Sequence, residues 1–198
     1  MPAVYVNSAA VLKAFCGEHG GITCTSSNAK AVIDWSWARR EKILFFPDEH
    51  LGRNTANKMG LAKEEMIVWD PFQPNGGNTR GAIQRAKLIL WKGHCSVHQM
   101  FQPVHVDNFR KQYPEGKVIV HPECHEDVVN KADLSGSTEF IIKTVTAAPA
   151  GTAWAVGTEL NLVNRLKRNL TDKKVFFLSS TVCQCATMFR IDGAHLCW

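Results

Sequence analysis

The sequence has no feature of a membrane-spanning or secreted protein. None of its apolar runs approaches the roughly 20 residues that are needed to cross a bilayer. The first residues also lack the basic region, the apolar core and the cleavage site of a signal peptide. We therefore expect a cytoplasmic protein with no membrane partner.

Paired cysteines are not expected either. Seven cysteines are an odd number, and the chain carries no export signal, so a disulfide framework is not predicted. Cysteine is common in protein cores, and Cys16, Cys24 and Cys197 are predicted to be buried there as thiols. The remaining cysteines are then available for other chemistry.

Strong charge is missing as well. The formal net charge is +5, and the basic residues are scattered along the chain. The short basic clusters at residues 165–168 and 173–174 are typical of solvated helix faces, and no aromatic-basic motif accompanies them. We expect no nucleic-acid partner. A slightly positive cavity for a small anionic substrate fits this composition.

What the sequence does contain is an alternation of short apolar segments with amphipathic helical patterns, which predicts parallel sheets covered by helices on both faces. The expected strands are residues 3–6, 22–24, 43–46, 88–91, 118–120, 152–155 and 175–178. The clearest expected helices are residues 9–15, 28–37 and 159–168. The predicted class is α/β, with two similar three-layer αβα domains related by pseudo-symmetry.

The polar turns after these strands recur in the same order in both halves of the chain. Turns after residues 6, 24, 46 and 91 match turns after residues 120, 135, 155 and 178. The predicted domains are residues 1–105 and 106–198. A segment rich in Pro, Gly and Asn, at about residues 69–80, has no counterpart in the second half and is interpreted as an inserted ordered loop or lid.

Two cysteine-bearing turns occupy equivalent places in this repeat. Cys95 follows the strand at residues 88–91, and Cys183 and Cys185 follow the strand at residues 175–178. A thiolate at such a turn can bind a soft metal, and two turns could aim at one centre. The alternative is a local zinc site formed by Cys183, Cys185, His195 and Cys197, although this spacing is poor for structural zinc.

Hydroxyl groups open two of the predicted helices in equivalent places. Ser26 lies in one of these turns and the Ser137-Thr138 pair in the other, where hydroxyl and backbone N–H groups suit phosphate or carboxylate. The alternative is that these residues are simple helix N-caps, which Ser and Thr favour. Their repetition favours a shared anion site.

Titratable and polar side chains occur in the other turns. His121 and Glu123 flank Pro122, which stiffens the turn, and such a pair can act as a general acid and base. His98 lies three residues after Cys95. Tyr5 and Asn7 project on one face at a strand end and are candidate binders of carboxylate or amide groups. The alternatives are a surface turn for His121-Pro122-Glu123 and a structural role for Tyr5.

Together these motifs resemble the quinolinate synthase family. The resemblance covers essentially the whole chain and rests on an ordered series of motifs. They are Tyr5-Val6-Asn7-Ser8, Thr25-Ser26-Ser27, Pro47-Asp48, His50-Leu51-Gly52, Gly93-His94-Cys95, Val97-His98, His121-Pro122-Glu123-Cys124, Gly136-Ser137-Thr138 and residues 185–191. The inserted segment resembles a longer subgroup of the family.

The resemblance implies three αβα domains around a pseudo-threefold axis, each giving one cysteine to a [4Fe–4S] cluster with one open iron. Cys95 and Cys185 are the implied ligands, with Cys183 as the fallback. The implied enzyme is a transferase of de novo NAD biosynthesis that condenses iminoaspartate with dihydroxyacetone phosphate. L-aspartate oxidase or aspartate dehydrogenase is the implied functional partner. The implied site residues are His121, Glu123, Tyr5 and His98 for catalysis and Tyr5, Asn7, Ser26, His121, Glu123, Ser137 and Thr138 for substrate binding.

This chain matches only two of the three domains. The resemblance therefore predicts a fragment that lacks the first domain, its cluster cysteine and its substrate-binding residues, and that is inactive alone. Two other interpretations remain open at this point: a non-catalytic αβα module that binds a phosphorylated metabolite, and a zinc-binding structural fragment.

Overall fold

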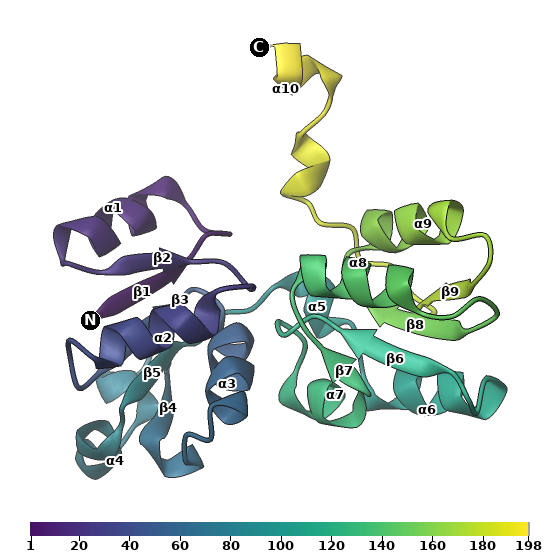
Figure 1. The fold of residues 1–198 in the computed structure, drawn as a ribbon. Helices are drawn as coiled ribbons and strands as arrows, with labels where there is room; N and C mark the ends of the chain where they lie inside the picture. The colour runs from purple at the N-terminus through teal and green to yellow at the C-terminus, as the bar shows by residue number, and fades with distance from the viewer. Residues whose placement is uncertain (198) are drawn as a thin grey trace. The chain divides into compact units, whose positions relative to one another are not determined.

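Two short parallel sheets organise the chain, one in each of the units Met1–His94 and Cys95–Trp198. The computed structural model describes residues 1–197 and is drawn in Figure 1. Helices cover both sheets, which confirms the predicted α/β class with two αβα units. The division between the units falls before Cys95, whereas the sequence placed it between residues 105 and 106.

The first unit has a five-stranded parallel sheet with the strand order β2-β1-β3-β5-β4. Its strands are β1 (Pro2–Tyr5), β2 (Ile22–Cys24), β3 (Ile43–Phe46), β4 (Met66–Trp69) and β5 (Leu88–Trp91). Its α-helices are α1 (Ala10–Glu18), α2 (Ala29–Trp37), α3 (Glu49–Lys58) and α4 (Arg80–Arg85), and its 3-10 helices are η1 (Lys63–Glu65) and η2 (Pro74–Gly77).

The second unit has a four-stranded parallel sheet with the order β7-β6-β8-β9. Its strands are β6 (Lys117–Val120), β7 (Leu134–Ser135), β8 (Ala153–Gly157) and β9 (Lys174–Phe177). Its helices are α5 (Ser96–Gln99), α6 (Pro103–Gln112), α7 (Glu126–Lys131), α8 (Thr138–Ala147), α9 (Leu160–Asn169), η3 (Met188–Arg190) and α10 (Gly193–Cys197).

Alternating apolar residues explain the layers of the first unit, because successive strand residues point to opposite faces of a sheet. Ala3 and Tyr5 of β1 pack in the cluster that α2 and α3 cover. Val4 between them packs in a different cluster with Cys16 of α1. The sheet is therefore buried on both faces.

The second unit follows the same rule. Val118 and Val120 of β6 pack with residues of α6 and α7, including Val106 and Val128. Ile119 between them packs in a separate cluster with residues of α8 and α9. Both faces of the second sheet are again apolar, which is typical of parallel sheets between two helical layers.

The two sheets confirm the internal repeat. Strands β2-β1-β3-β5 of the first unit stand in the same order as β7-β6-β8-β9 of the second. The one addition is β4, which pairs with β5 at the edge of the first sheet and was not predicted. Each matched polar turn therefore lies at the carboxyl end of an equivalent strand.

The inserted segment is an ordered loop that begins where β4 ends. The Asn78 side chain donates to the backbone oxygens of Val68 and Gly76, both at 2.8 Å. Asp70 at the start of the loop forms an ion pair with Lys92 at 2.6 Å. These contacts close the loop against β4 and the end of β5.

The described cysteines differ from the prediction at one position. Cys16 and Cys24 are buried as expected, but Cys197 is exposed at the end of α10. The error has a physical reason, since none of the residues of α10 is buried and the helix offers no core position.

Among the described residues, no helix is both long enough and apolar enough to span a bilayer.

At Gly52, helix α3 packs closely against the first sheet. A Cβ atom there would lie 2.5 Å from Leu90 Cδ2 and 2.8 Å from Phe45 Cδ1, and both neighbours are fully or almost fully buried. We expect Gly52→Ala to lower the free energy of unfolding by about 1–3 kcal/mol through overpacking. Urea denaturation measures this loss.

Gly17 provides the matched control, because it also lies in a helix but a Cβ atom there would meet nothing within 4 Å. Gly17→Ala should leave stability unchanged or raise it by up to about 1 kcal/mol. Equal effects of the two substitutions would contradict the close packing of α3.

Candidate functional site

Three buried titratable side chains meet in the second unit. His98 comes from α5, and His121 and Glu123 come from the turn that follows β6. Their exposed fractions are 6%, 2% and 5%. The two imidazole rings stack, with centroids 4.7 Å apart and an interplanar angle of 21°. This cluster lies at the carboxyl end of a parallel sheet, where ligands of such folds bind.

His121 and Glu123 interact within a single turn. Nδ1 of His121 lies 3.1 Å from Oε2 of Glu123 and 3.3 Å from the Glu123 backbone nitrogen. When Nδ1 carries a proton it can donate to the carboxylate, and when it does not it can accept from the backbone N–H. The ring therefore has a partner in either state, which suits a group that releases and recovers a proton.

His98 is held in its neutral form. Its pKa is lowered from 6.5 to about 4, chiefly by burial and also by the neighbouring His121, while Glu123 opposes the shift. Nδ1 of His98 lies 3.5 Å from Oε2 of Glu123. Near neutral pH the ring is therefore an uncharged imidazole that faces a carboxylate.

This pKa shift predicts how stability depends on pH in the metal-free chain. Between pH 6.5 and about 4 the unfolded chain binds a proton at His98 that the native chain does not bind. The free energy of unfolding should therefore fall as pH falls through this range, by about 3 kcal/mol in total from this residue. Urea denaturation at a series of pH values measures the slope.

The substitution His98→Gln should remove this contribution and flatten the pH profile. His19→Gln is the control, because His19 is exposed in the first unit. If the His98→Gln profile kept the slope of the unsubstituted chain, another group would have to be responsible.

Cys95 extends the cluster to a group of potential metal ligands. Ligand atoms of Cys95, His98 and Glu123 all lie within 4.8 Å of one another. Cys95 is half-buried and immediately precedes α5, which places its side chain one helical turn from His98. The group offers sulfur, nitrogen and oxygen donors together.

The other predicted ligands lie in the segment after β9. Cys183 and Cys185 are half-buried, and the sulfur of Cys185 accepts a hydrogen bond from the Met188 backbone nitrogen at 3.4 Å. Neither residue belongs to the Cys95 group. Convergence of Cys95 and Cys185 on one centre thus stays a prediction.

Thr158 is a site residue to which the sequence assigned no role. It follows β8, is 3% exposed, and its Oγ1 lies 3.3 Å from Nε2 of His98. The next residue, Glu159, has a structural task, since its carboxylate caps α9 by accepting from Leu162 N at 3.1 Å. The one available signal was that the turn containing Thr158 recurs in the internal repeat. This indicated that the turn lies at the end of a strand, but it did not indicate a role for the Thr158 side chain.

The predicted anion-binding residues of the second unit have different surroundings. Ser137 is buried and caps α8, since its hydroxyl accepts from the Phe140 backbone nitrogen at 3.3 Å. Thr138 is the first residue of α8 and is exposed. The N-cap interpretation therefore describes Ser137, and Thr138 offers its hydroxyl to solvent or a ligand.

Three predicted binding residues lie in the first unit. Tyr5 ends β1 and is buried, and its hydroxyl oxygen accepts from the Asn7 side-chain amide at 2.9 Å. Ser26 lies in the turn after β2 and is half-buried. Its turn is held by Asn28, whose side-chain oxygen accepts from the Thr25 backbone nitrogen at 2.6 Å. The structure thus joins Tyr5 and Asn7, as their alternation along the strand end suggested.

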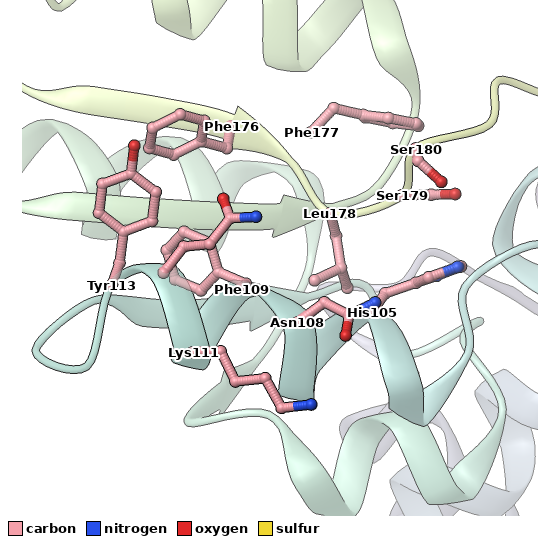
Figure 2. Close-up of a pocket in the computed structure, with 11 residues that line it drawn as sticks. His105, Asn108, Phe109, Lys111, Tyr113, Phe176, Phe177, Leu178, Ser179 and Ser180 are labelled. Carbon is pink, nitrogen blue, oxygen red and sulfur yellow. The ribbon is translucent and has the colours of Figure 1, made fainter.

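A separate pocket of about 400 Å³ lies between α6 and β9. Figure 2 shows the rings of Phe109, Tyr113 and Phe176 along its wall, with Ser179 and Ser180 where the chain leaves β9. None of the residues predicted for catalysis or binding lines it. The buried titratable cluster of His98, His121 and Glu123 thus lies outside this pocket.

The chain matches a known protein family and several of its curated members. The model of a family described as quinolinate synthetase A protein matches residues 2–198. The chain is similar to proteins named quinolinate synthase from Rhodopirellula baltica, with 59% identity over 199 residues, and from Acidobacterium capsulatum, with 55% over 200 residues. A quinolinate synthase from a Nocardioides species is 54% identical over 205 residues.

These alignments include all of this chain but only part of each relative. The covered share is 51% for the Rhodopirellula protein, 54% for the Acidobacterium protein and 52% for the Nocardioides protein. The chain thus spans about half the length of the curated relatives that it matches.

Proposed function

The chain belongs to the quinolinate synthetase A protein family, and we propose that it supplies acid–base and substrate-binding residues of a quinolinate synthase. In the proposed reaction, iminoaspartate condenses with dihydroxyacetone phosphate, and loss of phosphate and water closes the pyridine ring of quinolinate. The product is a precursor in de novo NAD biosynthesis. The observation that supports this proposal most directly is the buried cluster of His98, His121 and Glu123 in a chain that matches the family from residue 2 to residue 198.

Ring closure of this kind needs several proton transfers, to and from carbon, nitrogen and the departing hydroxyl groups. His121 has the geometry for this task, because Nδ1 has a hydrogen-bond partner with or without its proton. Glu123 stabilises the protonated ring at 3.1 Å. Neutral His98 belongs to the same cluster and can donate to or accept from a polar substrate group.

The substrates are anionic, with two carboxylates on one and a phosphate on the other. Thr138, beside the N-cap residue Ser137, is proposed to bind one such group through its hydroxyl and the N–H groups that begin α8. Tyr5, Asn7 and Ser26 of the first unit are also proposed as substrate-binding residues. The slight positive charge of the chain suits this substrate class.

The family implies a [4Fe–4S] cluster, which is held by cysteine thiolates. Cys95 and Cys185 fit two of its ligand positions, because both thiols are partly accessible and Cys185 already accepts a backbone N–H, as cluster sulfurs often do. The third thiolate would come from the part of the family that this chain does not span. When bound, the cluster supplies a Lewis acid that polarises a hydroxyl for dehydration.

Iminoaspartate is a reactive imine, so an enzyme that oxidises aspartate must work nearby. We propose L-aspartate oxidase or aspartate dehydrogenase as this functional partner. Dihydroxyacetone phosphate is a stable metabolite and needs no dedicated supplier.

The proposal is tested by joining this chain to the portion of the Rhodopirellula baltica relative that it does not cover. The fusion, purified and reconstituted with iron and sulfide without oxygen, should form quinolinate from the two substrates. The chain alone should not, because it spans about half of the relative. A fusion with a full complement of iron and sulfide that forms no quinolinate would contradict the proposal.

The same preparation tests the cluster ligands. Cys95→Ser and Cys185→Ser should each lower the iron and sulfide content of the fusion, and Cys24→Ser should not, because Cys24 is buried in the first core. Full cluster content in the Cys95→Ser, Cys185→Ser double variant would reject both ligands.

A further inference from the structure

We propose that Thr158 is a positioning residue of the candidate site. Its hydroxyl donates to Nε2 of His98 and thereby holds the His98 ring with a protonated Nδ1 turned toward the carboxylate of Glu123. The inference rests on the proposed function, because it names the residue that orients two side chains of the proposed acid–base cluster. All of these residues belong to the second unit.

The sheet places Thr158 in the site. Thr158 directly follows β8, which pairs in parallel with β6 up to Val120 and Gly157. The pairing continues into the turn after β6, where the backbone N–H of His121 donates to the Gly157 oxygen at 2.9 Å. The turns after the two strands therefore begin side by side. Thr158 is 3% exposed, and a hydroxyl buried to this extent needs a partner within the protein.

His98 supplies this partner. Oγ1 of Thr158 lies 3.3 Å from Nε2 of His98, which is 6% exposed. A hydroxyl group can rotate to donate to whichever acceptor faces it, so it can donate to a lone pair on Nε2. In a neutral imidazole one ring nitrogen carries the proton, and the bond made by one nitrogen decides the state of the other. A donor at Nε2 therefore places the proton on Nδ1.

The bond from Thr158 also selects one of two ring orientations. The ring of His98 stacks on that of His121, with centroids 4.7 Å apart and an interplanar angle of 21°. Stacking fixes the plane of the ring, but it tolerates a half-turn that exchanges the nitrogens with ring carbons. Only one of the two orientations brings Nε2 to the Thr158 hydroxyl. In that orientation Nδ1 faces Glu123.

The surroundings of Nδ1 favour a proton on this atom. Nδ1 of His98 lies 3.5 Å from Oε2 of Glu123, where a lone pair would face the negative charge of a carboxylate. At this separation Nδ1 is buried and makes no hydrogen bond among the described residues. Hydrogen bonds between catalytic groups are often long in ligand-free sites and shorten when substrate binds. A protonated Nδ1 is thus poised to donate to Glu123.

This arrangement orients the carboxylate that assists His121. Oε2 of Glu123 lies 3.1 Å from Nδ1 of His121, so the same oxygen faces an imidazole nitrogen on each side. Thr158 orients His98, and His98 in turn restrains Glu123 against His121. In many catalytic groups the base is likewise oriented by a third residue. Thr158 contributes by holding this order and takes no part in proton transfer.

The tautomer of His98 is the first test and is measured in the 198-residue chain. Nitrogen-15 NMR of the histidine-labelled chain at neutral pH distinguishes protonated from unprotonated ring nitrogens. The His98 signals are those that disappear in His98→Gln. We expect a protonated Nδ1 and an unprotonated Nε2. A predominant proton on Nε2 would overturn the proposal.

Substitutions of Thr158 test its part in this choice. Thr158→Val keeps the shape but removes the donor, so His98 should shift toward the tautomer with the proton on Nε2, which predominates in free histidine. Thr158→Ser keeps the hydroxyl and should keep the proton on Nδ1. Thr146→Val is the control, because Thr146 is exposed on α8. Circular dichroism checks folding, and Thr158→Ala replaces the valine variant if that variant does not fold. An unchanged His98 tautomer in the folded variant would overturn the role of Thr158.

The reconstituted fusion tests the consequence for the reaction. Thr158→Val should lower kcat about 10- to 100-fold at full iron and sulfide content, because the acid–base groups lose their alignment. KM should change much less, since Thr158 is not a proposed substrate-binding residue, and Thr158→Ser should keep most of the rate. An unchanged kcat in Thr158→Val would overturn the inference. Failure of the proposed function differs, because the unsubstituted fusion would then form no quinolinate while NMR still reports the His98 tautomer.

Discussion

Replacing Glu123 by glutamine is expected to lower quinolinate formation by about 100-fold or more in the fusion with the Rhodopirellula portion. Glutamine has nearly the same shape, so the turn after β6 should keep its conformation. Its neutral amide oxygen, however, cannot stabilise a protonated His121 at 3.1 Å as the carboxylate does. Initial rates at saturating substrate concentrations measure the effect on turnover.

A matched substitution separates this role from a general loss of charge. Glu139 is exposed and forms a surface ion pair with Lys143, so Glu139→Gln should leave the rate nearly unchanged. The loss in Glu123→Gln should appear in kcat even when the cluster content equals that of the unsubstituted fusion. Equal rates for the two variants would show that Glu123 takes no part in proton transfer.

Replacing Phe101 by alanine is expected to lower the free energy of unfolding of the second unit by about 3–5 kcal/mol. Phe101 is fully buried just after α5 and packs edge-on against Phe177 of β9, with ring centroids 5.4 Å apart. It joins α5, which carries His98, to the core that contains β6. Its removal should therefore leave a large cavity directly under the site.

Urea denaturation measures this loss, and Phe72→Ala is the control because Phe72 is 92% exposed. The control should change stability by no more than about 0.5 kcal/mol. A folded Phe101→Ala chain with unchanged stability would contradict the burial of this side chain.

The strands were largely predictable because each is a short apolar run between polar turns. The runs at residues 22–24, 43–46 and 88–91 are strands with those bounds. β4 was missed because its four residues stand beside a loop rich in Pro and Gly, which dominates the local pattern. β7 was missed because it contains only two residues, and its place is set by pairing with β6.

The ends of helices were harder to predict. The first helix was expected to stop at residue 15, but α1 continues through Gly17 to Glu18. The chain turns only afterwards, at Gly20, which has a positive φ of 64°. The glycine that ends the helix was thus not the first one in the sequence.

In the candidate site, contacts between residues of one turn were predictable from the sequence, whereas contacts between distant residues were not. The His121 and Glu123 pairing was predictable because the two residues lie in one turn. The contact between His98 and Thr158 spans 60 residues and depends on the order of strands β6 and β8, which no local pattern reveals. The contact between Tyr5 and Asn7 in the first unit was predictable too, because the two residues are only two positions apart.

The position of β4 has a consequence for how such proteins change over evolution. It lies at the border of its sheet, hydrogen-bonded on one side to β5. Residues can be inserted or deleted at the edge of the sheet without displacing the interior strands. The candidate functional turns follow the carboxyl ends of those interior strands. Length variation among family members should therefore concentrate around residues 60–80, and a shorter natural connection grafted there should leave the rest of the unit folded.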